Sequence, residues 1–509
     1  KRIMKNIFKI AIVLTLAITI YSCSDSYYDT NTPSNAVAPE SVAINNILPS
    51  AIQATMSAQY SAAVSLAQVD QHIASAFNDQ NIDKHYQNSL DEYWRLVYSK
   101  ALPNIKVLED KATATNSSHY LAIAKVLKAI NIGLTTDLHG DVPYIEATLA
   151  ATNFYPKYDA QQIIYTDVIK LLDDAIVLFS TPNTSIFTPG ADDLIYSGKA
   201  ASWTKAAYTF KARFQLHLMK VNGATTTASA VLSSLSKGFT ANSDDFQLKY
   251  NSINTNPWYQ SQLGLSTGNL TFYISNHFIS YMNGGAVFPF ASSSVTMDPR
   301  MPLLVDLSTY SSAGITPGPD PTLVANYIGS TNGTATTSKT KIGTQFFYSK
   351  IDSPIVYLTY AEAKFMEAEA QFLLAGGTPT STGTNSASYT AYLAGIGANM
   401  DKIGVAATNK NNYLADASIA KGAAAIQLKD IMRQKFIALF LNPETFTDYR
   451  RYDFSTNAFK NLTIPANTDP LNGGKWIRRF VYSNNEKSAN TANYNLNFKS
   501  MITPVWWDN

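Results

Sequence analysis

The chain has 509 residues, of which 46% are hydrophobic and 15% are charged, enough material for a large core. Lys and Arg together number 39, and Asp and Glu number 37. Four of the basic residues lie in the first nine positions, so the rest of the chain is close to neutral. This balance argues against a nucleic-acid-binding protein, which normally carries a basic stripe or a high domain pI.

The N-terminus is typical of a secretory signal. A basic start precedes an apolar run from Ile10 to Ile20, and small Ser22 stands directly before Cys23, the only cysteine. The run is too short to span a bilayer, which needs about 20 apolar residues. The alternative is a buried N-terminal helix with a structural thiol. We expect residues 1–22 to be a signal peptide, and with a single cysteine no disulfide forms within the chain.

Helical periodicity dominates the next part of the chain. Residues 40–76 are rich in Ala, and the stretch 91–109 contains Pro103, which should kink that helix or end a turn there. Apolar residues then recur every three or four positions, and the helices fall into pairs: 91–109 with 118–135, 160–179 with 200–219, and 357–375 with 422–441. The pattern predicts a mainly α protein, a tetratricopeptide-like helix-pair superhelix; an irregular helical bundle is the alternative.

Two segments between the helices have a different composition. Residues 236–356 are rich in Asn, Ser, Thr, Gly and Pro, and residues 376–390 are similar. Long loops in compact domains commonly form binding surfaces. We therefore expect one domain over 23–509, with a helical scaffold at about 40–235 and 357–455 and loop-rich, ligand-facing insertions at about 236–356 and 376–420.

Three patterns suggest catalysis, and none is convincing. The motif GLSTG around Ser266 lacks the preceding buried strand of a nucleophile elbow, and only His277 follows it. In TDLHGDVPY, a helix C-terminal turn closed by Gly140 explains Asp137, His139 and Asp141 better than a metal site does.

The acidic helix around residues 362–369 is the third pattern. Glu362 and Glu369 would lie about 10 Å apart along a helix. We expect these carboxylates, with Glu367, to be solvated or to cap the helix rather than to act as a glycosidase pair. The sequence predicts neither an enzyme nor a metal site.

Seven phrases in order resemble one family. They are DTNTPSNAV (29–37), GDVPYIEA (140–147), MDPRMPLL (297–304), YAEAKFMEAEA (360–370), FLNPETFTDYRRYDF (440–454), RRFVYSNNE (478–486) and PVWWDN (504–509). Together with the cysteine-terminated signal they resemble the SusD/RagB outer-membrane lipoproteins of Bacteroidetes-type bacteria, in the branch that ends in Pro-Val-Trp-Trp. The resemblance spans essentially the whole chain after residue 22.

The resemblance implies a fold and a role. It implies four tetratricopeptide-like helix pairs, a lipid anchor on Cys23 and a place on the cell surface at the outer membrane. Such a protein is a lid on a SusC-like TonB-dependent transporter and binds nutrient oligomers, usually glycans and sometimes peptides, without catalytic activity. No cofactor is expected, and Asp and Asn are too numerous in the loops to assign ligands for a structural calcium ion. The alternatives are a peptide-capturing lid, a surface glycan hydrolase and a structural adhesin.

Aromatic and planar polar side chains suit a sugar, whose ring faces carry C–H groups and whose edge carries hydroxyls. The candidates for ligand contact are loop residues: Trp258, Tyr259, Tyr86, Asn78 and Asp79. We assign the other tryptophans to the core: Trp94, Trp203, Trp476, Trp506 and Trp507. Five arginines should fix internal turns through carboxylate pairs: Arg300, Arg450, Arg451, Arg478 and Arg479.

Overall fold

The computed structural model of the chain describes residues 2–4, 42–77, 81–149, 152–267, 272–334, 340–382 and 385–509. The chain divides into two compact units, Lys1–Ala43 and Ile44–Asn509. In the first unit, residues 2–4 are helical and exposed. The predicted signal peptide, apart from residues 2–4, and Cys23 lie outside the described residues. Everything below concerns the second unit.

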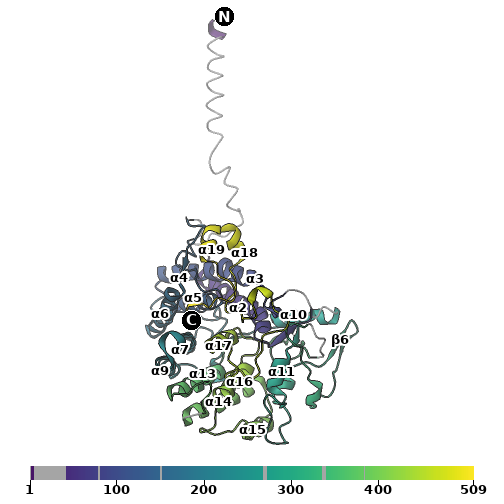
Figure 1. Cartoon of the computed structure of the whole chain (residues 1–509). Coiled ribbons are helices and arrows are strands. Elements are labelled where there is room, and N and C mark those ends of the chain that lie inside the picture. Colours follow the sequence, from purple (N-terminus) through teal and green to yellow (C-terminus); the bar gives the residue numbers. More distant parts are fainter. Residues whose placement is uncertain are drawn as a thin grey trace. The chain divides into compact units, whose positions relative to one another are not determined.

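Helices dominate this unit and pack in succession (Figure 1). Each contacts the next in the order α2 (Ile44–Val69), α4 (Leu102–Ala114), α5 (Ser118–His139), α6 (Gln161–Ser180), α7 (Ala200–His217), α9 (Ala224–Leu235), α13 (Tyr360–Leu374) and α14 (Ser386–Ile403). The prediction of a mainly α, helix-pair architecture is confirmed. The small α8 (Met219–Asn222) joins α7 to α9.

The helix containing Pro103 begins with an irregular turn. The short α3 (Asp91–Leu96) continues into a π-helical turn, η4 (Val97–Ala101), and α4 follows with Pro103 in its first turn. Proline is tolerated there because the first amides of a helix have no partner within it. The expected disturbance at Pro103 is therefore present, as a π turn before the proline.

The C-terminal end of α5 explains the TDLHGDVPY motif. Gly140 follows the helix with a φ of 83°, where a side chain is disfavoured, and its amide donates to the carbonyl of Thr136 at 2.7 Å. A β-carbon on Gly140 would also lie 3.0 Å from the Arg479 guanidinium. The turn predicted from the sequence is confirmed.

The partner of α13 differs from the prediction. Helices α14 and α15 (Ala407–Ala415) occupy much of residues 376–420, where we expected a loop-rich insertion, and α14 packs on α13. Asn385 caps α14 through the amide of Ser388 at 2.7 Å, and Gly395 lies against the ring of Phe365. The buried face of α14 combines Gly395 and other small residues with the larger Tyr392, Ile396 and Met400. Helix α16 (Leu428–Ala438) contacts both α13 and α14.

The described part of residues 236–356 is irregular, as predicted. It contains η6 (Asn242–Asp244), α10 (Pro257–Gln262), η7 (Leu263–Thr267), α11 (Asn276–Met282), α12 (Met301–Leu304) and η8 (Val324–Asn326). Toward the C-terminus, the remaining elements are α17 (Glu444–Arg451), η9 (Pro470–Asn472), α18 (Asn484–Ala489), α19 (Thr491–Asn497) and η10 (Trp506–Asp508).

The strands are short. The described residues form four two-stranded antiparallel sheets: β1 (Ile73–Ser75) with β5 (Phe272–Ile274), β2 (Val142–Pro143) with β3 (Tyr158–Asp159), β4 (Phe246–Leu248) with β8 (Ile355–Leu358), and β6 (Thr309–Ser311) with β7 (Gly314–Thr316). In β1–β5, Ile73 is opposite Ile274 and Ser75 is opposite Phe272. This pairing anchors the segment after α2, which carries Tyr86.

Candidate functional site

The segment after β1 is held by one buried carboxylate. Asp83, in η3 (Ile82–Lys84), accepts from Asn332 Nδ2 and from the Gly333 amide, each at 2.6 Å. Burial raises the pKa of Asp83 to about 6, although these hydrogen bonds act in the opposite direction. Asp83 therefore connects residues 81–90 to a loop more than two hundred positions away.

Asn332 extends this connection to three further elements. Its Nδ2 also donates to the carbonyls of Gln68 at 3.1 Å and Ile73 at 2.8 Å, while Ser275 Oγ donates to its Oδ1 at 2.6 Å. The end of α2, strand β1 and the start of α11 thus meet at one amide side chain. A fixed platform results, because a fully bonded buried polar group tolerates little displacement.

The next turn presents Tyr86. His85 has a φ of 58°, and its carbonyl accepts from Asn472 Nδ2 at 2.8 Å. Its ring is buried 5.6 Å from that of Trp476, and burial lowers the pKa of His85 to about 3, so that the imidazole is neutral at physiological pH. Tyr86 follows directly and is half-buried.

The five predicted contact residues have different settings. Asn78 and Asp79 lie outside the described residues, beside Phe77, which is 52% exposed and which sequence reasoning missed. Trp258 lies on α10, is 3% exposed and contacts Tyr60 edge-to-face at 5.1 Å. Tyr259 is half-buried on the same helix, and the described contacts do not join Tyr86 to either residue of α10. Their part in ligand binding stays a prediction.

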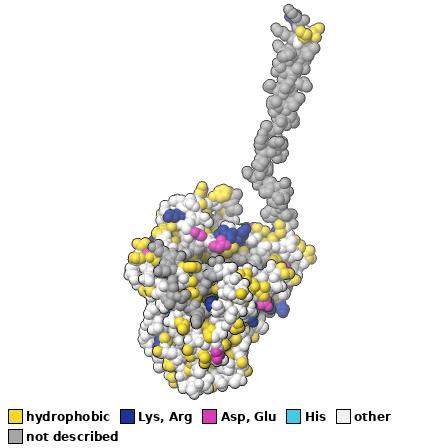
Figure 2. Space-filling model, turned by 90° about the vertical axis from the view of Figure 1, so that its right-hand side faces the viewer, with side chains coloured by type: hydrophobic (Ala, Val, Ile, Leu, Met, Phe, Trp, Pro, Cys, Tyr) yellow, Lys and Arg dark blue, Asp and Glu magenta, His cyan; other side chains and the backbone are white. Residues whose placement is uncertain are grey.

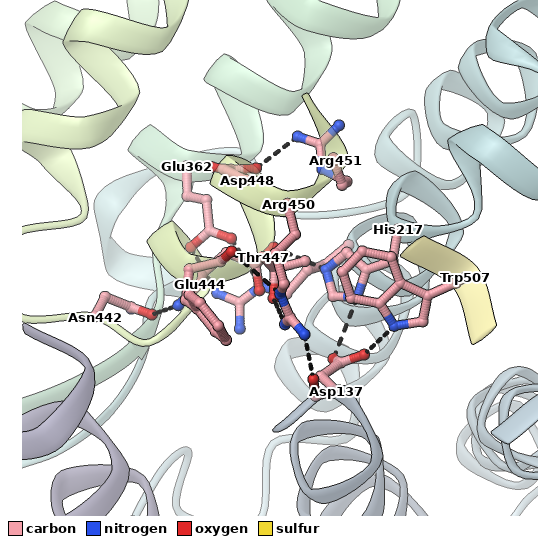
Figure 3. Close-up of polar contacts among 12 residues, drawn as sticks. Asp137, His217, Glu362, Asn442, Glu444, Thr447, Asp448, Arg450, Arg451 and Trp507 are labelled. Atoms are coloured by element: carbon pink, nitrogen blue, oxygen red, sulfur yellow. Dashed lines mark hydrogen bonds and ion pairs between the residues drawn. The ribbon is translucent and has the colours of Figure 1, made fainter. Parts of the chain in front are cut away.

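The centre of the unit holds a cluster of buried charges (Figure 3). Arg213 of α7 binds Glu362 of α13 through two hydrogen bonds of 2.7 and 2.6 Å. Arg451 of α17 binds Glu369 likewise, at 2.6 and 3.0 Å, and also Asp448 at 2.5 Å. Both glutamates are 0% exposed, so the expectation that they are solvated or capping was wrong. Hydropathy could not show that each would meet an arginine from a distant helix.

A second part of this cluster surrounds His217. His217 Nε2 lies 2.7 Å from Glu444 Oε1, and Nδ1 lies 3.3 Å from Asp137 Oδ2. Burial by itself lowers the pKa of His217, but the two carboxylates raise it to about 9, so the imidazole is charged at neutral pH. Asp137 also accepts from Tyr165 and, at 2.8 Å, from the Trp507 indole. The cluster therefore ties the C-terminal tryptophan to α5, α6, α7 and α17.

A substrate has no access to His217 and the two carboxylates beside it. The cavity beside Asp137, Arg213 and Glu444 measures about 10 Å³, about the volume that one water needs. Ser266 lies in the 3₁₀ helix η7 and donates to the carbonyl of Leu263 at 3.1 Å, so it is not on a strand-to-helix elbow. Among the described residues, no three His, Cys, Asp or Glu side chains are grouped as metal ligands would be.

The five arginines fall into two groups. Arg300, Arg451 and Arg478 pair with carboxylates, of Asp298, Glu369 and Asp508 respectively, as expected. The other two bind main-chain carbonyls instead: Arg450 donates to that of Asp137 at 2.6 Å, and Arg479 to that of Pro504 at 2.7 Å. Trp94, Trp203 and Trp507 are buried as predicted, whereas Trp476 and Trp506 are partly exposed.

Comparison with known proteins identifies the family. Residues 31–483 match a family model, SusD-like, described as starch-binding and associating with the outer membrane. The chain belongs to the SusD-like family. Members of the SusD-like family are binding proteins rather than enzymes. A search of the curated proteins finds no match.

Solved SusD-like structures share the fold. A SusD/RagB family protein from Bacteroides thetaiotaomicron is 24% identical, with a TM-score of 0.72 over 92% of this chain and 99% of that one. A chitin-binding SusD homologue from Flavobacterium johnsoniae is 20% identical, with a TM-score of 0.68 over 91% and 98%. A SusD homologue from Bacteroides fragilis is 18% identical, with a TM-score of 0.68 over 92% and 100%.

A separate property concerns the membrane. None of the helices in the described ranges combines the length and the apolarity needed to cross a bilayer.

Proposed function

We propose that this SusD-like protein captures glycan oligomers at the cell surface and delivers them to a SusC-like TonB-dependent transporter of the outer membrane. The family match over residues 31–483 carries this proposal. The signal-like sequence ending at Cys23 supports an anchor, in which acyl chains on the cysteine hold the protein to the membrane. Each buried methylene adds about 0.8 kcal/mol, so several chains bind firmly.

The glycan would contact the surface around Tyr86. Phe77 and Tyr86 expose part of their rings beside a segment that Asp83 and Asn332 fix in place. A fixed aromatic ring can stack on the C–H face of a sugar without first losing conformational freedom. Asn78 and Asp79 would add hydrogen bonds to hydroxyls. The face of the molecule shown in Figure 2 carries few charged side chains.

Helix α10 has a divided role in this proposal. Tyr259 is half-buried and would contact the ligand through its exposed edge, whereas Trp258 is buried against Tyr60 and would support the helix that presents Tyr259. Asn256 caps α10 by accepting from the Tyr259 amide at 3.1 Å, which fixes that residue further.

Binding is tested with the full chain in detergent, by calorimetric titration with maltooligosaccharides and chito-oligosaccharides. We expect one of the two series to bind, and Tyr86→Ala to weaken binding about tenfold, since an aromatic contact contributes about 0.5–1.5 kcal/mol beyond its buried area. Tyr155→Ala is the matched control, because Tyr155 is 66% exposed on a different loop, before β3. Equal losses in both variants would contradict the proposed surface.

The transporter and the alternatives need separate measurements. Affinity purification from solubilised outer membrane should recover a TonB-dependent transporter, and recovery of none would contradict the delivery role. Binding of peptides but not glycans would identify a peptide-capturing lid. Release of reducing ends from a polysaccharide by the purified wild-type chain would identify a hydrolase.

A further inference from the structure

A groove of about 940 Å³ opens on the side of the unit formed by the first helices. One wall is a face of α2, with Ser50, Gln53 and Ser57 at successive helical turns. A second wall continues from α3 into α4, with Leu96, Lys100 and Asn104 four positions apart. Leu194 and residues 248–251 and 253–255, at and after the end of β4, also line the groove. Eight residues of helix rise about 12 Å, so each wall is long enough for an oligomer rather than an ion.

The second wall contains the π-helical turn Val97–Ala101, which includes Lys100. Such turns are rare, strain the hydrogen-bond ladder and occur frequently at functional sites. Here the turn lies in a wall of the groove, and Asn104 Nδ2 donates to the Lys100 carbonyl at 2.9 Å. The irregularity thus coincides with the groove.

The groove carries unbalanced positive charge. Lys100 and Lys249 both line it and are exposed, and none of the described lining residues is acidic. Neither lysine forms an ion pair with any described side chain, whereas neighbouring Lys106 on α4 is 2.6 Å from Asp110. Two ammonium groups that share an open groove without a counter-ion attract an anionic ligand.

The remaining lining favours a carbohydrate. Ser50, Gln53, Ser57, Asn104 and Thr255 offer hydroxyl and amide groups that match sugar hydroxyls. Apolar side chains line the groove as well, among them Ile253 at 88% exposed and Leu194 at 41%, and can contact C–H faces.

We infer that this groove is a second binding site, for an oligosaccharide bearing carboxylate or sulfate groups. The inference rests on the proposed glycan-capturing function but concerns a site separate from the surface around Tyr86. Lysine ammonium groups bind such anions as flexible point charges, and the amides and hydroxyls bind the sugar hydroxyls. The chain would then hold neutral and acidic parts of a heterogeneous polymer at different places.

The test is a calorimetric titration of the full chain with an oligogalacturonate, a sulfated galactan oligosaccharide and a neutral chito-oligosaccharide of similar length. We expect at least one acidic oligomer to bind, with an affinity that falls on raising the salt concentration from 0.02 to 0.2 M. The double variant Lys100→Gln/Lys249→Gln should lose at least tenfold in that affinity and keep its response to neutral glycan. Comparison of the uronate and sulfate series shows which anion is preferred.

Lys475→Gln/Lys499→Gln is the matched control, because both lysines are exposed and neither lines the groove. It should bind the acidic oligomer as the wild-type chain does. Failure of both acidic oligomers to bind, an equal loss in the control, or tighter binding of an oligoglutamate peptide would overturn the inference. In those cases retained neutral binding leaves the proposed function standing, whereas loss of all glycan binding ends both.

Discussion

Charged side chains of the central cluster have partners of opposite charge, whereas the lysines of the groove have none among the described residues. In the cluster, Arg213 and Arg451 each meet a carboxylate at 2.6 Å, and His217 lies between two more. In the groove, Lys100 and Lys249 have no described acidic neighbour in the lining. Burial accounts for the difference, since an unpaired charge inside a protein is costly while an exposed lysine stays solvated. Matched charges thus connect the helices of the scaffold, whereas the two groove lysines stay available to an anionic ligand.

The largest effect should come from breaking a matched pair. Glu362→Ala leaves the Arg213 guanidinium buried without its bidentate partner. We expect the free energy of unfolding to fall by about 3–5 kcal/mol, the usual cost of removing one member of a buried pair. Urea denaturation of the full chain measures this. Glu92→Ala is the control, because its pair with Arg95 is exposed and should change stability by less than about 1 kcal/mol.

A similar fall in the free energy of unfolding of both variants would show that the buried pair contributes no more to stability than the exposed pair. The same proteins also test the hydrolase alternative. If Glu362 only fixes Arg213, the variant changes stability alone, whereas cleavage of a polysaccharide by the wild-type chain would support the hydrolase.

Stability should depend on pH through His217. Its folded pKa of about 9 lies above the ordinary 6.5, so the stabilisation is complete below pH 6.5 and is lost as pH rises through 9. This amounts to about 3 kcal/mol at 1.4 kcal/mol per pH unit. Glu444 acts on the acid side: His217 and Arg213 overcome the effect of burial and lower its pKa to about 2, so its contribution is lost as pH falls from 4.5 towards 2.

Denaturation curves at pH 6, 7.5 and 9 measure the alkaline part. His217→Gln is expected to flatten the dependence between pH 6 and 9, because the residue that titrates is then absent. An unchanged slope in that variant would assign the dependence to another group.

A smaller effect should follow from one hydrogen bond of the same cluster. Trp507→Phe removes the indole N–H that donates to Asp137 at 2.8 Å but keeps an aromatic ring beside Arg450. We expect the free energy of unfolding to fall by about 2 kcal/mol, since a buried acceptor loses a donor. Trp476→Phe, at a partly exposed ring stacked on Phe454, should cost less. A larger loss of unfolding free energy in Trp476→Phe than in Trp507→Phe would contradict this expectation.

The sequence predicted the helices with strong periodicity, such as α5, α6 and α7, because their buried faces carry large apolar residues. It missed α14, although Tyr392, Ile396 and Met400 recur there at helical spacing, because the Gly-, Ser- and Thr-rich residues 376–390 favour a loop. For Arg300 and Arg478, the sequence predicted that the partner would be a carboxylate, but not which residue would supply it. That Asp137, His217 and Glu444 would meet depends on packing between three helices, and no local pattern contains it.

The candidate sites were predictable to different degrees. Tyr86 could be predicted because the sequence shows an aromatic residue among Asn and Asp residues. Only the structure shows that Asp83 and Asn332 fix the segment that carries it. The groove was not predicted at all. Lys100 and Lys249 are almost 150 positions apart, and Lys100 belongs to a helix that periodicity alone would have described as regular.

The smallest effect on stability should come from the groove itself. In the double variant Lys100→Gln/Lys249→Gln, two charges disappear, yet neither takes part in a described ion pair. The free energy of unfolding should therefore change by less than about 0.5 kcal/mol, as for ordinary surface positions. Measured beside Glu362→Ala, this gives the contrast directly: removal of one buried charge should destabilise the scaffold by several kcal/mol, and removal of two exposed charges should leave its stability almost unchanged. A loss above about 2 kcal/mol in the groove variant would mean that these lysines support the fold, and the distinction between matched and unmatched charge would fail.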